Sequence, residues 1–87
     1  MPPIDIYVKM MCPYCTRAKS LLKKKGADFN EIDITFSGDK RQEMHERSGG
    51  GRTVPQIFIG QTYVGGCDEL LALDAEGGLD PLLAGEA

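Results

Sequence analysis

The sequence predicts an α/β fold in which a four-stranded mixed β-sheet is flanked by helices. Residues 4–34 follow a strand–helix–strand pattern, which implies a right-handed crossover between two parallel strands. The pair Gly60-Gln61 separates two short runs of strand-forming residues, so it predicts a two-residue hairpin turn. Helix-like segments precede and follow the hairpin and can cover the sheet. The strand at residues 4–9 is expected in the centre of the sheet.

The first half of the chain predicts two strands with a helix between them. Residues 4–9 alternate and are rich in β-branched and aromatic residues, as strands are. Residues 13–25 predict a helix that Gly26 ends. One face of this helix carries side chains at helical spacing: Tyr14, Cys15, Ala18, Leu21 and Leu22. Residues 29–34 predict the second strand, with Ile32 and Ile34 on one face.

The second half of the chain predicts the hairpin strands at residues 56–59 and 62–64. The remaining segments are helical: residues 39–47, residues 67–76, and a short last turn over Leu82 and Leu83. Ser37 or Gly38 could cap the first of these helices, and Asp80-Pro81 is a candidate N-cap and N1 pair for the last turn.

Composition and charge indicate one small globular domain over residues 1–87. We expect no secretion signal and no membrane span, because no apolar run approaches the length that a span needs. Residues 1–52 hold all ten Lys and Arg and seven acids, whereas residues 53–87 hold six acids and no Lys or Arg. No basic stripe lies beside aromatic residues, which argues against nucleic-acid binding. The cations near the cysteines would suit a small anionic ligand.

Two of the three cysteines form a Cys-x-x-Cys pair, Cys12 and Cys15, at a strand-to-helix junction. This layout is typical of a thiol–disulfide redox site. The free N–H groups at a helix N-terminus stabilise a thiolate, and Pro13 suits the first helical position. We therefore expect Cys12 to attack and Cys15 to resolve. One close pair with one distant cysteine fits a reducing compartment, such as the cytoplasm, better than a secreted disulfide scaffold.

Three motifs together resemble the glutaredoxin family, and among its dithiol members the bacterial glutaredoxin 3 type. Cys12-Pro13-Tyr14-Cys15 is similar to the dithiol site, Thr53-Val54-Pro55 to the Thr-Val-Pro loop, and Gly65-Gly66-Cys67-Asp68 to the second glycine-rich turn. The similarity covers essentially the whole chain. It implies a thioredoxin fold and a glutathione-dependent thiol–disulfide oxidoreductase that reduces glutathione mixed disulfides and protein disulfides.

The resemblance also implies a glutathione site. Pro55 would follow a cis peptide bond, and the Val54 backbone would pair with the cysteinyl part of glutathione. Asp68 and the backbone beside it would hold the γ-glutamyl end. Lys9 and Gln42 match positions that reach the glycyl carboxylate. The implied glutathione-binding residues are Lys9, Tyr14, Gln42, Thr53, Val54, Pro55, Gly66, Cys67 and Asp68.

Several of these residues have simpler interpretations. Lys9 could be an exposed strand end, Gln42 an exposed helix residue and Tyr14 a partly buried helix aromatic. Cys67 could contribute only its backbone, although a helix N-terminus could make its thiol somewhat acidic and oxidisable. Arg41 and Arg52 are weaker candidates for steering an anion, and their simpler interpretation is that they are solvated. His45 is expected to be exposed.

Three alternative functions stay open. An iron–sulfur carrier would use Cys12 and external glutathione, but cluster-binding relatives usually have a less rigid residue than Pro13. A zinc site made of Cys12, Cys15, His45 and Cys67 has suitable ligands but lacks a second close pair. Thioredoxin-like reduction by a flavoprotein would differ in partner rather than in chemistry.

The partners and cofactors follow from the resemblance. Glutathione is expected as a co-substrate, with no permanently bound cofactor and no metal. The protein substrates would be glutathionylated or disulfide-containing proteins. The chain is expected to act as a monomer.

Overall fold

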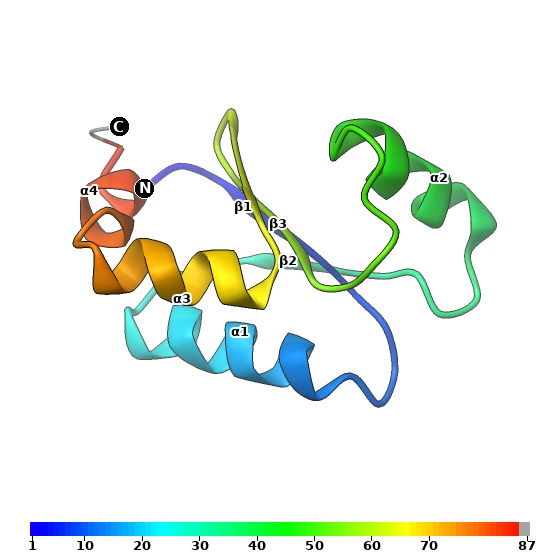
Figure 1. Cartoon of the computed structure of the whole chain (residues 1–87), viewed down its shortest axis with the longest axis horizontal. Helices are drawn as coiled ribbons and strands as arrows, with labels where there is room; N and C mark the ends of the chain where they lie inside the picture. The colour runs from blue at the N-terminus through cyan, green and yellow to red at the C-terminus, as the bar shows by residue number, and fades with distance from the viewer. Residues whose placement is uncertain (86–87) are drawn as a thin grey trace.

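The computed structural model describes residues 1–85 and contains one four-stranded mixed sheet with helices on both faces (Figure 1). Its elements are β1 (Ile4–Val8), α1 (Pro13–Lys24), β2 (Asn30–Asp33), α2 (Gly38–Arg47), β3 (Gln56–Ile59), β4 (Thr62–Gly65), α3 (Cys67–Ala75) and α4 (Leu79–Leu83). The strand order is β2-β1-β3-β4. β1 pairs in parallel with β2 and antiparallel with β3, and β3 pairs antiparallel with β4. The expected sheet, with β1 as an inner strand, is confirmed.

Alternation along β1 divides the core between the two faces of the sheet. Ile4, Ile6 and Val8 pack in one cluster with the buried residues of α1, α3 and α4. Tyr7 points to the other face and packs with Met44 of α2 and Phe58 of β3. In Figure 1, α1 and α3 run side by side on the first face, and α2 stands apart from them.

Polar contacts dock α2 on the sheet, although Met44 is the one residue of this helix that is buried. Tyr7 donates its hydroxyl hydrogen to Glu43, and Arg47 Nη1 donates to Tyr7 Oη at 2.9 Å and to Asp5 Oδ2 at 3.0 Å. The Arg47 guanidinium also lies 4.1 Å from the centre of the Phe58 ring. These polar contacts therefore hold α2 on the sheet, because residues 39–47 have few apolar side chains to pack against it.

Two expectations were wrong in detail. The N-cap of α4 is Gly78 and not Asp80. The helix begins at Leu79, whose side chain is fully buried in the core, so Asp80 lies inside the first turn. The Asp80 carboxylate instead accepts a hydrogen bond from Lys25 Nζ at 2.9 Å. Tyr14 does not belong to the buried face of α1, since it is 56% exposed. Of the two candidate caps of α2, Ser37 and Gly38, Ser37 is the N-cap, and its Oγ accepts a hydrogen bond from the Lys40 N–H at 3.1 Å.

None of the helices in residues 1–85 combines the length and the apolar character that crossing a bilayer requires.

Candidate functional site

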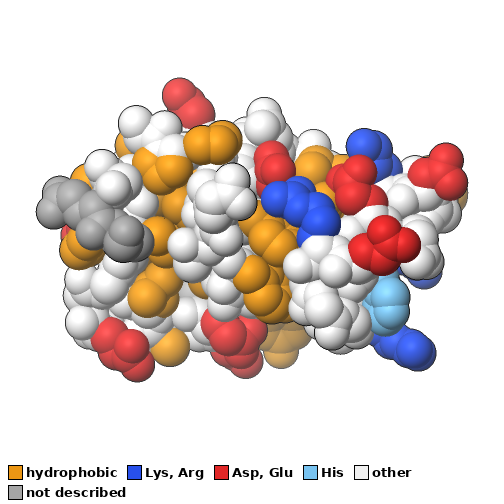
Figure 2. Space-filling view, turned by 90° about the horizontal axis from the view of Figure 1, so that it is seen from above, with side chains coloured by type: hydrophobic (Ala, Val, Ile, Leu, Met, Phe, Trp, Pro, Cys, Tyr) orange, Lys and Arg blue, Asp and Glu red, His pale blue; other side chains and the backbone are white. Residues whose placement is uncertain are grey.

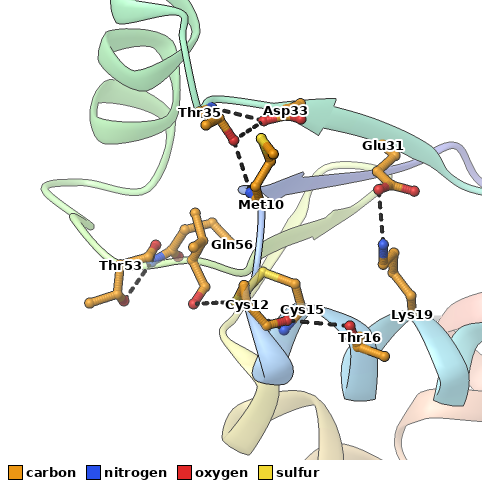
Figure 3. Close-up of a disulfide and its surroundings, with 11 residues drawn as sticks. Met10, Cys12, Cys15, Thr16, Lys19, Glu31, Asp33, Thr35, Thr53 and Gln56 are labelled. Carbon is orange, nitrogen blue, oxygen red and sulfur yellow. Dashed lines mark hydrogen bonds and ion pairs between the residues drawn. A yellow bond between two sulfur atoms is a disulfide. The ribbon is translucent and has the colours of Figure 1, made fainter.

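Cys12 ends the loop after β1 and is the N-cap of α1, with Pro13 in the first helical turn. Its Sγ accepts a hydrogen bond from the Cys15 N–H at 3.1 Å. The two cysteines form a disulfide with their Cα atoms 5.2 Å apart (Figure 3). An N–H donor and the positive end of a helix both stabilise negative charge on Cys12 when the disulfide is reduced. The first turn of α1 holds no acidic residue that would oppose this.

The two cysteines differ in access to solvent. Cys15 is 2% exposed and packs in the core with Ala18 and Leu22 of the same helix. Cys12 is only partly buried. A bulky external disulfide can therefore reach the sulfur of Cys12 but not that of Cys15.

The loop of residues 53–55 faces Cys12. Cys12 Sγ lies 3.8 Å from the carbonyl oxygen of Val54, and the Val54–Pro55 peptide bond is cis, as expected. Within residues 1–85, no hydrogen bond involves the Val54 N–H. The Val54 backbone therefore offers both a donor and an acceptor beside Cys12 Sγ.

Two pockets of about 340 and 280 Å³ meet at this loop and form one groove. Both are lined by Tyr14, Thr53 and Val54. The first also holds Cys12 and the cationic side chains of Lys9, Arg41 and Arg52. The second also holds Pro55, Gly66, Cys67, Asp68 and Glu69. The groove is therefore cationic at one end and acidic at the other.

The acidic end lies at the N-terminus of α3. Gly66 is the N-cap, and Glu69 Oε1 accepts from the Gly66 N–H at 2.7 Å. Asp68 is exposed to solvent and lines this part of the groove. This end can offer a carboxylate and helix N–H groups to one zwitterionic group.

The charges on the face shown in Figure 2 follow a similar division. In Figure 2, Lys and Arg side chains lie at the end of the molecule that carries α2, together with the single His, and acidic side chains are mixed among them. The opposite half of this face shows acidic but no basic side chains, in line with the charge difference between residues 1–52 and 53–87.

Gln42 lies outside the groove. It lines an adjoining pocket of about 330 Å³ and donates to Glu46 Oε1 at 3.0 Å. Arg41 and Arg52 line both this pocket and the groove. The sequence made these two arginines only weak candidates for steering an anion, because the fold alone brings their side chains together beside Cys12. Their position beside Cys12 makes them candidates for anion binding.

The simpler interpretation of Cys67, in which it contributes only its backbone, fits the structure better than the alternative of an acidic thiol. Cys67 is 4% exposed, and burial holds the pKa of its thiol above the ordinary value, a shift to which Asp68 and Glu69 add. Arg17 opposes the shift but does not cancel it. Cys67 lines the groove, and its burial and raised pKa do not favour a reactive thiolate.

The loop before Cys12 is held by residues that the motifs did not indicate. Thr35 Oγ1 accepts from the Met10 N–H at 2.9 Å, and Asp33 Oδ1 accepts from the Thr35 hydroxyl and N–H at 2.5 and 2.8 Å (Figure 3). Met11 follows with a positive φ of 57° and is 96% exposed. An Asp-x-Thr sequence after a strand was the available signal for this turn.

Among residues 1–85, no three His, Cys, Asp or Glu side chains are grouped so that they could hold a metal ion.

Comparisons with known proteins agree on one family. The model of the glutaredoxin family matches residues 4–64. Glutaredoxin 3 of Escherichia coli strain K12 is 58% identical over 83 residues, which cover 95% of this chain and 99% of the relative. The glutaredoxin of Pseudomonas aeruginosa strain PAO1 is 54% identical over 84 residues, which cover 97% of this chain and 99% of the relative.

Solved structures give the same result. The solution structure of glutaredoxin from Brucella melitensis has a TM-score of 0.82 and 58% identity, and the match covers 95% of this chain and 89% of that one. The crystal structure of a buckwheat glutaredoxin–glutathione complex has a TM-score of 0.85 and 32% identity, with 95% and 77% covered.

Proposed function

This chain belongs to the glutaredoxin family and is a glutathione-dependent thiol–disulfide oxidoreductase, and we propose that Cys12 is its nucleophile and Cys15 its resolving thiol. The resemblance seen in the sequence and the thioredoxin fold that it implied are both confirmed. The remaining question is which residues perform the exchange and how they bind glutathione.

The difference in solvent exposure between Cys12 and Cys15 supports the roles proposed for them. The partly exposed sulfur of Cys12 lies on the groove, within 3.8 Å of the Val54 carbonyl, whereas Cys15 is 2% exposed behind it. A thiolate exchanges only with a disulfide that it can approach end-on, so access selects Cys12.

Glutathione carries two carboxylates and one ammonium, and the groove offers charges that complement them. We place its cysteinyl backbone against the free N–H and C=O of Val54, as an added strand pairs with an edge. The γ-glutamyl end then lies at Asp68 and the N-terminus of α3. The glycyl carboxylate lies among Lys9, Arg41 and Arg52. A glutathione contact of Gln42 stays a prediction.

Other proposed contacts in the groove are those of Tyr14, Thr53, Pro55, Gly66 and Cys67. The buckwheat glutaredoxin that was solved as a complex with glutathione supports a site in a fold of this kind.

The single-thiol route begins with reduced Cys12. Its thiolate attacks the glutathione sulfur of a mixed disulfide, the S–S bond breaks, and the substrate leaves as a thiolate that takes up a proton. A second glutathione thiolate then attacks the glutathione sulfur bound to Cys12. This step releases oxidised glutathione and restores the Cys12 thiolate, so the substrate gains two electrons in total.

The dithiol route reduces a protein disulfide. Cys12 attacks one sulfur of the substrate, and Cys15 then attacks Cys12 and expels the second substrate thiol. The products are a reduced substrate and the Cys12–Cys15 disulfide, the form that this structure contains. Two glutathione molecules reduce that disulfide in two exchanges.

The cellular setting is part of the proposal. The chain would act as a monomeric single domain over residues 1–87, in the reducing cytoplasm, on glutathionylated or disulfide-containing proteins. It would need no permanently bound cofactor or metal, because a thiolate nucleophile and a glutathione co-substrate complete the reaction.

The test is turnover of a small glutathione mixed disulfide, coupled to glutathione reductase and NADPH. The wild-type protein is compared with Cys12→Ser and Cys15→Ser. Activity that requires Cys12 and survives without Cys15 supports the assignment. A Cys12→Ser protein that turns over like the wild type refutes it.

A further inference from the structure

Gln56 carries the one buried side-chain amide among residues 1–85. It is 4% exposed and opens β3 directly after Pro55. Burying an amide costs free energy unless both of its ends are hydrogen-bonded. No step of the thiol–disulfide exchange uses the Gln56 side chain, so the hydrogen bonds that this side chain makes point to another role.

The amide bridges β4 and the loop that faces Cys12. Gln56 Nε2 donates to the Thr53 carbonyl oxygen at 2.9 Å and lies 3.5 Å from Thr53 Oγ1, and Gln56 Oε1 accepts from the Tyr63 hydroxyl (Figure 3 shows the Gln56–Thr53 side). A carbonyl oxygen can only accept, so the nitrogen must face Thr53 and the oxygen must face Tyr63. The orientation of the amide is therefore fixed.

The far end of this bridge is anchored in the sheet. The Tyr63 ring stacks on Phe58, its partner across the β3–β4 pair, with ring centres 5.0 Å apart. Burial holds the pKa of Tyr63 above its ordinary value, and Glu69 adds to the shift. The hydroxyl therefore stays protonated and able to donate at neutral pH.

The loop of residues 48–51 lies in close contact with the Gln56 amide. A Cβ on Gly51 would lie 2.5 Å from Ser48 Oγ and 2.8 Å from Gln56 Nε2. The Gly51 N–H donates to the same Ser48 Oγ at 2.7 Å. Residues 48–51 thus close against the amide, and Gly51 is the residue that permits so close an approach.

We propose that Gln56 is a positioning residue for glutathione, because it holds the Thr53 carbonyl and so keeps the Val54 backbone directed at Cys12. This inference rests on the proposed function, in which Val54 pairs with the cysteinyl part of glutathione. Gln56 touches no reacting atom. It acts through the peptide unit between Thr53 and Val54, one residue from the carbonyl that lies 3.8 Å from Cys12 Sγ.

The test compares binding with intrinsic thiol reactivity. Gln56→Met keeps a similar volume and removes both bonds, so KM for a glutathione mixed disulfide should rise about tenfold while kcat changes little. Alkylation of reduced Cys12 by iodoacetamide does not use the Val54 backbone, and its rate and pH profile should stay those of the wild type. Gln61→Met, in the exposed hairpin turn, is the matched control.

Tyr63→Phe provides a second variant that keeps the aromatic stack. It leaves the bond to Thr53 in place, so KM should rise by a smaller factor, about threefold. In the Gln56→Met background the same change should have no further effect on KM, because Tyr63 acts through the amide. If Gln56→Met does not fold, Tyr63→Phe alone decides the question.

Several results would overturn the inference. A wild-type KM in Gln56→Met with a lower melting temperature would make the amide purely structural, and an unchanged KM in a folded Tyr63→Phe would do the same. Equal loss of turnover and of alkylation would indicate general damage to the site. A wild-type protein that does not turn over the mixed disulfide contradicts the proposed function itself and removes the basis of this inference with it.

Discussion

Cys12 Sγ and the Val54 carbonyl oxygen lie 3.8 Å apart although 42 positions separate the two residues. The sheet topology explains this meeting. β1 and β3 are antiparallel neighbours in which Tyr7 pairs with Gln56, so the loop after β1 and the loop before β3 leave the sheet at the same end. Cys12, the proposed nucleophile, comes from the first loop, and the Val54 backbone, the proposed contact of glutathione, comes from the second. Neither loop forms the groove alone.

Replacing each cysteine of the pair should separate the two routes. Cys12→Ser should reduce turnover of a glutathione mixed disulfide to the uncatalysed rate, since an unactivated serine hydroxyl is too weak a nucleophile to replace a thiolate in disulfide exchange. Cys15→Ser should keep that turnover and lose most reduction of a protein disulfide, because nothing then displaces the substrate from Cys12. Coupled assays with both substrates measure this. Loss of mixed-disulfide turnover in a folded Cys15→Ser protein would contradict the single-thiol route.

The sequence was sufficient for the fold and for the reactive pair, because both depend on local signals. The helix start at Pro13 and the turn at Gly60-Gln61 are each visible in a few consecutive residues. The cis bond before Pro55 was implied by family resemblance and not by local chemistry.

The cationic side of the groove was predicted only in part, since Lys9 was implied by the family resemblance and Arg41 and Arg52 were weak candidates for steering an anion. Arg41 comes from α2, and Arg52 comes from the loop after it. The polar contacts of Arg47 that dock α2 involve residues about 40 positions away, which no local pattern shows. The buried amide of Gln56 was missed because a glutamine in a strand resembles any half-exposed strand residue.

Asp68→Asn should weaken binding of the γ-glutamyl ammonium. The change removes one negative charge at the acidic end of the groove and keeps the size of the side chain. KM for a glutathione mixed disulfide should rise about tenfold with kcat nearly unchanged, as loss of one charge-assisted hydrogen bond predicts. Steady-state kinetics of Asp68→Asn and of the control Glu76→Gln measure the effect.

A second substrate makes this prediction specific. The mixed disulfide of cysteine lacks the γ-glutamyl group, so Asp68→Asn should leave its turnover unchanged. A similar loss with both substrates would mean that Asp68 acts on the site in general and not on the ammonium.

The arginines should contribute more to binding than Gln42. Arg41 and Arg52 line the pocket that contains Cys12, whereas Gln42 is bonded to Glu46 in the adjoining pocket. Arg41→Gln or Arg52→Gln should raise KM about threefold at low salt, and the effect should shrink as salt screens these exposed charges. Gln42→Ala should have a smaller effect.

Kinetics at two ionic strengths test this, with Lys23→Gln in the exposed last turn of α1 as a control. If Gln42→Ala raises KM as much as the arginine variants do, the glycyl carboxylate reaches into the adjoining pocket, as the family resemblance implied.

Cys67 should resist alkylation at neutral pH. Burial holds the pKa of its thiol above the ordinary value, so its thiolate fraction at pH 7 is smaller than that of a free cysteine. In reduced protein treated with iodoacetamide, Cys12 should be modified first, and modification of Cys67 should rise only at more alkaline pH. Mass spectrometry of peptides over a pH series measures both rates. Equal modification of the two at pH 7 would show that Cys67 is accessible and acidic.

The turn at Asp33 and Thr35, which holds the loop before Cys12, should make the free energy of unfolding depend on pH. The hydrogen bonds from Thr35 hold the pKa of Asp33 below its ordinary value of 3.8. The folded state therefore binds this proton less readily than the unfolded state, and the resulting stabilisation is present above about pH 4. It is lost as the pH falls through the lowered pKa of the folded state.

Thr35→Val removes the hydroxyl that donates to Asp33 and accepts from the Met10 N–H. The variant should unfold at a lower denaturant concentration than the wild type at pH 6, and the difference should begin to narrow below about pH 4 as the pH falls towards the lowered pKa of Asp33 in the folded wild type. Thr62→Val, on the exposed edge strand β4, is a matched control that should show no such dependence. A Thr35→Val deficit that stays constant from pH 6 to pH 3 would mean that the Met10 bond alone, and not the Asp33 carboxylate, supports the loop.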